Sequence, residues 1–520
     1  MQKGRFLKNA VIMTASALLL RTIGMFFRVW LADSIGSEGM GLYQLIFSVY
    51  MLAATFATSG ITTAVTRLIA EELECGTARS VKRILWRAVG LSLAAGIAST
   101  VLVVALADPI SEWWIKDIRA ARSLRILAFS LPFMGVSSCI RGYFVACRRV
   151  VAPTNAQLLE QLVRMGIIFL IIGKSAARGL EYACAAVLFG DTAAEAASCG
   201  FMYLGYLRDR RRLTEKLGVR PFPPYRVTNK LVALSLPIMA GRYLTTTLRT
   251  VESLLVPDCL TRFGGSREQS VSQYGLFRGM AMPVIFFLSS FLNVLSTLLV
   301  PELSGTLSAE GKQGVESPVR RCVHITLTMS TVIGGVLWLF GEDIGVAFYG
   351  NSEVGFYIRW LAPLVPLMYL ESVVTGMLNG LDQQKYIFVY NVVDSALRIG
   401  LIVWLVPKHG IYGFLAVTYV SNLLTSVLCF VRLLKTAQTR FRAVDWVVRP
   451  LVCTAAALVV GRAAAIYMTA LSVVPRALLE SAVCVGVYLA MIYVTGGFKE
   501  WAAVRNVVSS KLSRKEELNS

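Results

Sequence analysis

Apolar residues occur along the chain in long runs separated by short polar segments, and each run is long enough to cross a bilayer. About twenty apolar residues in a helix span the hydrocarbon layer, whereas membrane β-barrels show short alternating segments that this pattern lacks. The pattern predicts an all-α polytopic membrane protein with about fourteen transmembrane helices. They are expected near residues 7–31, 42–66, 84–107, 124–146, 153–173, 181–206, 231–256, 274–300, 322–345, 357–380, 386–406, 411–433, 446–468 and 477–495.

The polar segments between these runs differ in charge. Segment 207–230 holds eight Lys and Arg residues, and segments 431–442 and 511–520 are also basic, whereas alternate loops such as 32–41 and 341–355 are acidic or poor in cations. Cytoplasmic loops of membrane proteins carry the excess of Lys and Arg. We therefore predict a multi-pass protein of the bacterial cell membrane with both termini in the cytoplasm, although the outside loop 111–123 fits less well.

The overall composition agrees with a membrane protein and gives no sign of an enzyme. The chain has 520 residues, of which 56% are hydrophobic, and a formal net charge of +21. Basic cytoplasmic loops account for this charge, so no nucleic-acid partner is predicted. The ten cysteines show no spacing typical of zinc and there are two histidines, so we expect neither a metal site nor a cofactor.

The chain contains an internal repeat with an offset of 234 residues. "LPFM" at 131–134 matches "VPLM" at 365–368, and "RMGII" at 164–168 matches "RIGLI" at 398–402. Both halves start on the same side of the membrane, which is typical of a parallel repeat around a central cavity. We predict two pseudo-symmetric six-helix lobes, followed by two further helices and a basic cytoplasmic tail. The predicted boundaries are 1–222 for the N-lobe, 223–440 for the C-lobe and 441–520 for the rest.

Five arginines within the predicted spans are not cancelled by acids of their own helix, apart from one that has Glu252 within a turn. Insertion of a charged side chain into a bilayer costs about 2.5–3.5 kcal/mol, so such residues usually face the bundle interior or water. A spacing of seven places two side chains only about 20° apart around a helix, and this spacing occurs in the first span of each half. Guanidinium groups bind phosphate in a bidentate manner. We therefore predict that a cavity for a diphosphate is lined by Arg21, Arg28, Arg242, Arg249 and Arg278.

Other charged residues in the spans have two interpretations. The pairs Glu160–Arg164 and Asp394–Arg398 have i,i+4 spacing and can neutralise each other within one helix. Glu371 is either a protonated carboxyl group or a partner of a nearby arginine. All of these residues, together with Glu252, are candidates for ion coupling or charge balance.

Several segments resemble the stage V sporulation protein B branch of the oligosaccharide flippases, within the multidrug/oligosaccharidyl-lipid/polysaccharide exporter superfamily: "RTIGMFFRVWLADSIGSEGMGLYQ", "TSGITTAVTRLIAEE" and "IRGYFVACRRVVAPTNAQLLEQLVR". The resemblance implies twelve core helices, often with two more, and transport of an undecaprenyl-diphosphate-linked saccharide. Related MurJ-type lipid II flippases hold the diphosphate with arginines at places similar to Arg21, Arg28 and Arg278. This chain differs at Ala281, where the MurJ-type pattern has an acid.

These features together favour a flippase for lipid II or another lipid-linked precursor of peptidoglycan or polysaccharide, with membrane lipids around it and envelope-synthesis proteins as candidate partners. A cation-coupled multidrug exporter of the same superfamily is an alternative, but cationic drugs would favour an acidic cavity. A membrane-embedded glycosyltransferase would need a large catalytic outside loop. A non-transporting protein of envelope or spore assembly also agrees with the fold.

Overall fold

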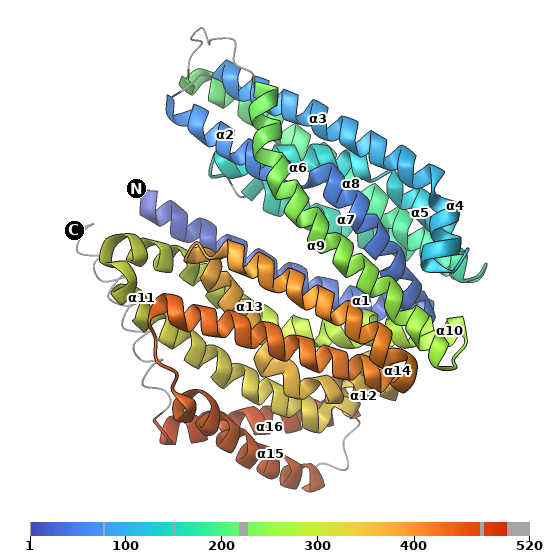
Figure 1. The fold of residues 1–520 in the computed structure, drawn as a ribbon, viewed down its shortest axis with the longest axis vertical. Helices are drawn as coiled ribbons and strands as arrows, with labels where there is room; N and C mark the ends of the chain where they lie inside the picture. Colours follow the sequence, from blue (N-terminus) through green and yellow to red (C-terminus); the bar gives the residue numbers. More distant parts are fainter. Residues whose placement is uncertain (1, 76–77, 150, 218–226, 468–472, 497–520) are drawn as a thin grey trace. The chain divides into compact units, whose positions relative to one another are not determined.

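The computed structural model describes residues 2–75, 78–149, 151–217, 227–467 and 473–496 (Figure 1). The secondary structure in these ranges is helical and no strand occurs in them, which confirms the all-α prediction. The predicted basic tail lies mostly outside the described residues, as does the predicted boundary at residue 222.

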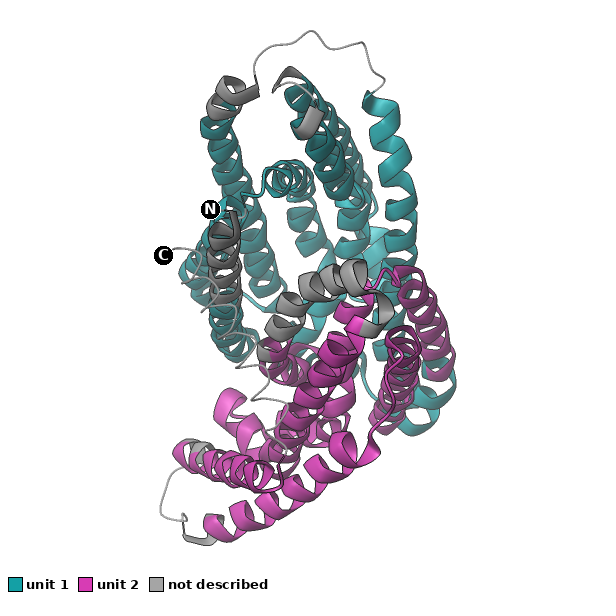
Figure 2. Cartoon of the chain, turned by 90° about the vertical axis from the view of Figure 1, so that its left-hand side faces the viewer, with its two compact units in different colours: residues 1–275, 402–410 teal, residues 276–401, 411–520 magenta. Residues whose placement is uncertain are grey.

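Contacts divide the chain into two compact units, which Figure 2 colours separately. Unit 1 consists of residues 1–275 and 402–410, and unit 2 of residues 276–401 and 411–520. The predicted lobe boundaries follow the repeated spans rather than these contacts, and they stay a prediction.

Unit 1 has a core built by aromatic and aliphatic residues of six helices. Tyr143 and Tyr206 are buried there with ring centroids 5.2 Å apart at a right angle, a favourable edge-to-face geometry. The elements of unit 1 are α1 (Gln2–Thr58), α2 (Ile61–Cys75), α3 (Ala78–Ala105), α4 (Ala107–Pro109), η1 (Ile110–Ile115), α5 (Ala120–Ala128), α6 (Leu131–Ala146), α7 (Val151–Ala176), α8 (Leu180–Leu217), α9 (Val227–Phe263) and α10 (Arg267–Tyr274). The six helices of the core are α2, α3, α6, α7, α8 and α9.

Unit 2 contains the last two helices of the described chain, which pack on α11. The hydroxyl of Tyr488 donates to the carbonyl of Thr328 at 2.6 Å, and Val332 belongs to the same buried cluster. The elements of this part of the chain are η2 (Gly275–Ala281), α11 (Met282–Tyr349), α12 (Ser352–Leu361), η3 (Ala362–Leu364), α13 (Val365–Gly380), α14 (Gln384–Ala437), η4 (Val444–Val448), α15 (Arg449–Tyr467) and α16 (Val473–Val494).

Ten described helical stretches are long and apolar enough to cross a membrane, or eleven if the bent pair α5–α6 forms one span. Two of them have 56 and 54 residues, more than twice the length that one span needs. Positive φ angles interrupt these two stretches, at Gly36 (71°) in α1 and at Gly410 (57°) in α14. Both glycines lie between predicted spans, so each stretch has room for two. The prediction of fourteen spans stays a prediction.

The helix limits differ from the predicted spans at two places. The span expected at 42–66 is interrupted, because α1 ends at Thr58 and α2 begins at Ile61. Gly60 has a φ of 79°, and a Cβ atom there would lie 2.3 Å from the carbonyl oxygen of Ser235, so the break allows α9 to approach closely. Residues 301–321, between two predicted spans, are helical within α11, since their Leu, Glu, Ala and Lys residues are good helix formers.

The internal repeat is visible in the helix limits. Helices α6 and α13 both have 16 residues, start 234 residues apart and carry a proline in the first turn. A Cβ atom at Gly96 would lie 2.8 Å from Cα of Pro132, and one at Gly334 would lie 3.3 Å from Cδ of Pro366. In each half, therefore, a glycine of the third span lets the start of the fourth span pack closely.

The turns after α6 and α13 are also equivalent. Arg148 and Asp382 have φ angles of 56° and 57°, a left-handed conformation that is unusual for residues other than glycine. The next residue of each turn binds a later span: Arg149 forms an ion pair with Asp209 of α8, and Gln383 accepts from Arg432 of α14. The positive charge is thus on the turn in the first half and on the span in the second.

Candidate functional site

The two predicted arginines of α1 lie in its first segment, before the break at Gly36. Arg21 is exposed and Arg28 is half-buried. Between them, Gly24 faces α7, with Nε2 of Gln161 3.9 Å from where its Cβ atom would be. Arg28 also lies within electrostatic range of Asp191 on α8. The charge of Arg28 is therefore partly balanced inside unit 1.

The two predicted arginines of α9 are both exposed. Arg242 and Arg249 lie beside the face of α9 that packs on the second segment of α1, where Thr250 donates to the carbonyl of Ser48 at 2.9 Å. Only 6% of the most apolar stretch of α9 is buried. Glu252 is half-buried on the same helix. Because exposure of these arginines to lipid would be costly, we infer that this side of α9 faces water.

Arg278 lies in unit 2, in the π-helical turn η2. Its side chain is exposed, whereas residues 274–277 and 279–282 are buried on both sides of it. A π-helical turn widens the helix by one residue and is frequent at functional sites. Here the wide turn directs one permanent cation away from an otherwise apolar, packed segment.

Arg164 forms the centre of a polar network in unit 1. Its Nη2 lies 2.8 Å from Oε1 of Glu160, and its Nε lies 2.7 Å from Oδ1 of Asp191. The other carboxylate oxygen of Asp191 accepts from the hydroxyl of Tyr43 at 3.5 Å. Asp191 and Glu195 of α8 are not among the residues predicted from the sequence, although each is an acid inside a predicted span. The network joins α1, α7 and α8.

Unit 2 contains a polar network at the equivalent place. Oγ of Ser421 donates to Oδ1 of Asp394 at 2.6 Å, and one turn later Oγ1 of Thr425 donates to Oε2 of Glu371 at 3.1 Å. Arg398 is half-buried on the same helix as Asp394. Hydroxyl groups of α14 therefore satisfy two carboxylates from different helices, and serine and threonine carry no signal in a sequence that would reveal this.

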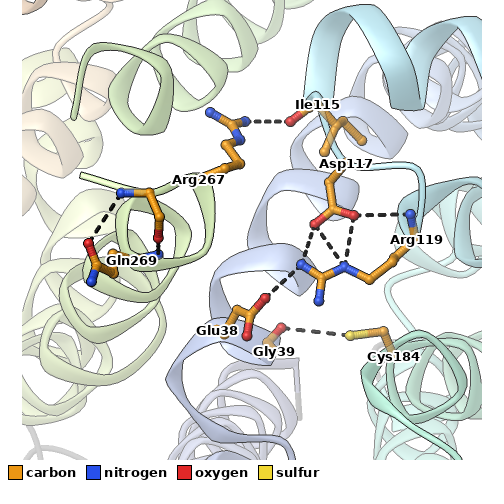
Figure 3. A network of polar contacts seen from close by, with 9 residues as sticks. Glu38, Gly39, Ile115, Asp117, Arg119, Cys184, Arg267 and Gln269 are labelled. Atoms are coloured by element: carbon orange, nitrogen blue, oxygen red, sulfur yellow. Dashed lines mark hydrogen bonds and ion pairs between the residues drawn. The ribbon is translucent and has the colours of Figure 1, made fainter. Parts of the chain in front are cut away.

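A third network lies where α1 breaks (Figure 3). Arg119 binds both carboxylate oxygens of Asp117 and donates to Glu38 at 2.6 Å. The hydrogen bonds to Asp117 and then to Glu38 raise the pKa of Arg119, so this group stays charged. Arg267 of α10 donates to the carbonyl of Ile115. The network fixes the loop between η1 and α5 against α1 and α10.

These observations define candidate residues in each unit separately: the arginines of α1 and α9 with the polar networks beside them in unit 1, and Arg278 of η2 in unit 2. Four of the predicted arginines lie in unit 1, and Arg278 lies in unit 2. Within the described residues, no group of three His, Cys, Asp or Glu side chains could hold a metal ion. Permanent cations of this kind can bind an anion without changing protonation.

A family model decides the family of the chain. The model described as "Polysaccharide biosynthesis protein" matches residues 6–307, more than half of the sequence. The chain belongs to the polysaccharide biosynthesis protein family. A second model, MatE, matches residues 268–404, in agreement with the predicted exporter superfamily.

Relatives of this family member in Bacillus subtilis (strain 168) have names of sporulation and flippase proteins. Stage V sporulation protein B is 26% identical over 416 residues, which is 79% of this chain and 80% of the relative. Lipid II flippase MurJ is 21% identical over 451 residues, with 81% of each protein covered. The family resemblance predicted from the sequence is thus confirmed.

Solved structures support the fold of this polysaccharide biosynthesis family protein. The lipid II flippase MurJ in an inward closed conformation has a TM-score of 0.72 and 13% identity, covering 95% of this chain and all of that one. An inward-facing multidrug resistance MATE family transporter has a TM-score of 0.63 and 13% identity, covering 82% and 98%. These likenesses show the fold, and together with the matching family models and relatives they agree with a multi-pass membrane transporter of this superfamily.

Proposed function

We propose that the protein moves a diphosphate-linked saccharide on a polyprenyl carrier, lipid II or a related envelope precursor, from the inner to the outer leaflet. The observation that carries the proposal is the exposure of Arg242, Arg249 and Arg278 on helices that are otherwise apolar. Several guanidinium groups bind a diphosphate through paired hydrogen bonds and keep their charge in a poorly solvated cavity. The names of the relatives, a lipid II flippase and a sporulation protein, agree with such a substrate.

The cycle that we propose is alternating access. Arg21 and Arg28 of α1 attract the diphosphate from the cytoplasmic side, together with the arginines of α9 and η2. Rearrangement of the two lobes then exposes the head group on the outside, while the lipid tail stays in the bilayer. The topology that this requires, with both termini in the cytoplasm, rests on the charge of the loops.

We propose two roles for the acidic residues of the predicted spans, charge balance and coupling to a driving force. Glu160 and Arg164 are 2.8 Å apart and Asp191 lies on the other side of the guanidinium group, an arrangement that balances charge within unit 1. Glu371 and Asp394 accept hydrogen bonds from hydroxyl groups of α14, and both lie within predicted spans, where a carboxyl group is costly. We propose the latter two, with Glu252 and Arg398, as the groups through which an ion gradient or the membrane potential drives transport.

A multidrug exporter of the same superfamily is the second candidate, favoured by the likeness to the MATE transporter fold. Its cationic substrates would meet the same five arginines. Because like charges repel strongly in a poorly solvated site, we place this function second.

The decisive experiment replaces the resident lipid II flippase of a bacterium by this protein. Lipid II exposed at the cell surface is measured after depletion of the resident flippase, with the protein level checked by blotting. We expect rescue by the wild-type protein, loss of rescue by Arg278→Ala, and partial rescue by Arg278→Lys, which keeps the charge but loses the bidentate geometry.

The matched control is Arg67→Ala, because Arg67 pairs with Glu71 on an exposed helix face. It should rescue as the wild type does. Rescue by Arg278→Ala at the wild-type level would contradict the role of the arginines. No rescue by a well-expressed wild-type protein would remove lipid II as the substrate.

A further inference from the structure

Two glycines in unit 1 bring the backbone of α1 into direct contact with that of α10 and with the first residue of η2. A Cβ atom at Gly41 would lie 2.0 Å from the carbonyl oxygen of Val271, and a Cβ atom at Gly275 would lie 2.0 Å from the carbonyl oxygen of Ser37. Real Cβ atoms do not approach other atoms so closely. The contact therefore requires glycine at both positions.

The contact is symmetric with respect to the internal repeat. Gly41 and Gly275 are 234 residues apart, the same offset that relates α6 to α13. Each glycine meets the carbonyl oxygen four residues before the other. The same point of the second span in each repeat thus touches its own equivalent, as residues do at a two-fold interface.

Polar contacts surround the glycine pair. Oγ of Ser37 and Oγ of Ser272 are 2.7 Å apart, beside the glycines. Lys116, in the loop between η1 and α5, forms an ion pair with Asp258 of α9. Arg267 of α10 donates to the carbonyl of the preceding residue, Ile115 (Figure 3). The start of the second repeat is therefore fastened to the first at one end.

Taking the proposed transport function as given, we propose that this contact, the glycine clasp, closes one end of the transport path and opens once in each cycle. Two features suit a closure that must be released. The glycine backbones meet without interlocking side chains, and the fastening groups are polar, with Lys116 about half exposed (48%). Partly exposed ion pairs contribute little to stability, so solvent can replace them when the helices part.

The first test measures how often the clasp opens. Cys259 on α9 follows Asp258 directly and is 1% exposed, so its thiol should react only when the clasp is open. A variant that keeps Cys259 and has the other nine cysteines replaced is placed in lipid nanodiscs and treated with a maleimide. We expect Gly41→Ala and Gly275→Ala to raise the labelling rate about tenfold, because the added methyl group overpacks the contact.

The matched controls are Gly90→Ala and Gly166→Ala, glycines in helices whose Cβ atoms would meet nothing within 4 Å. Both should label at the background rate. Should an alanine at 41 or 275 prevent folding, Lys116→Asp serves instead, with about a threefold rise expected and reversal in the double variant Lys116→Asp/Asp258→Lys. The proposal would be overturned if Cys259 were labelled at the background rate in every folded variant of the clasp. It would also be overturned if Gly90→Ala or Gly166→Ala raised the labelling rate.

The second test locks the clasp. The hydroxyl distance between Ser37 and Ser272 indicates Cβ atoms close enough for a disulfide, so Ser37→Cys/Ser272→Cys should crosslink under oxidation. We expect transport to stop in the oxidised protein and to return on reduction. The control pair is Thr261→Cys/Ser270→Cys, whose side-chain oxygens are 3.0 Å apart within the second repeat alone. Full transport with the clasp completely crosslinked would refute the proposal.

The two tests separate the clasp from the substrate. Labelling of Cys259 needs no saccharide, so it decides the clasp even where the wild-type protein fails to move lipid II. Conversely, transport that depends on Arg278 while the crosslinked clasp has no effect would keep the proposed function and remove only the closure.

Discussion

Asp209 is the buried carboxylate that holds the turn after α6, and its removal should reveal how the cost of an unpaired hydroxyl compares with that of an ion pair. The side chain accepts from the hydroxyl of Tyr143 at 2.8 Å and pairs with Arg149. Tyr143 is fully buried, whereas Arg149 is 37% exposed. In Asp209→Ala the arginine can turn to water, but the tyrosine hydroxyl stays in the core without its acceptor.

The magnitudes follow from this difference in exposure. An unsatisfied buried hydroxyl costs about 1–3 kcal/mol, and loss of a partly exposed ion pair adds about 0.5 kcal/mol. Asp209→Ala should therefore lower the free energy of unfolding by about 1.5–3.5 kcal/mol. Tyr143→Phe alone removes the donor but leaves Asp209 with Arg149, at a cost of about 1 kcal/mol.

The assay is thermal unfolding in detergent, compared between variants purified in the same way, with Arg67→Ala as the exposed-pair control. The double variant Tyr143→Phe/Asp209→Ala has no orphaned hydroxyl, so it should be more stable than Asp209→Ala. The substitution Tyr143→Phe would thus destabilise the wild-type protein but stabilise the Asp209→Ala variant. The reasoning is refuted if this reversal of sign is missing, or if Asp209→Ala has the same melting temperature as Arg67→Ala.

Two further predictions concern contacts repeated in both halves. Gly96→Ala should cost about 1–3 kcal/mol, because the methyl group would press on Pro132, whereas Gly90→Ala on the same helix should gain about 0.5–1 kcal/mol from helix propensity; opposite shifts of the melting temperature check this, and equal shifts contradict it. Arg432→Lys should lose about 1 kcal/mol, because lysine cannot repeat the two hydrogen bonds of 3.0 and 2.5 Å to Gln383; an unchanged melting temperature would show that charge alone suffices.

The fold could largely be predicted because lipid leaves the chain few choices. Apolar runs of bilayer length must be helical, since only a helix satisfies its own backbone groups there. The repeat was readable from short matches such as those at Pro132 and Pro366. The breaks were less visible: the interruption at Gly60 depends on how closely α9 approaches, and the helix through residues 301–321 depends on context beyond local polarity.

The candidate site could be predicted only in its charged members. An arginine in an apolar run is conspicuous, and Arg242, Arg249 and Arg278 are exposed; their role in binding stays a prediction. Partners from other helices were not predictable. Asp191 meets Arg164, and Ser421 meets Asp394, through packing that no spacing along the chain encodes.

The turn after α6 carries the positive charge of its contact, whereas the turn after α13 is neutral and binds a positive charge on the span. This difference has a consequence for folding. Two similar halves in one chain invite a helix of one half to dock on the other. Arg149 binds the carboxylate of Asp209, whereas Gln383 binds the guanidinium group of Arg432. A turn that docks on the wrong span would set arginine against arginine or leave a buried carboxylate beside a neutral amide. The different charges of the two turns thereby favour docking of each turn on the span of its own half. A chimera with residues 131–149 in place of 365–383 should therefore misfold.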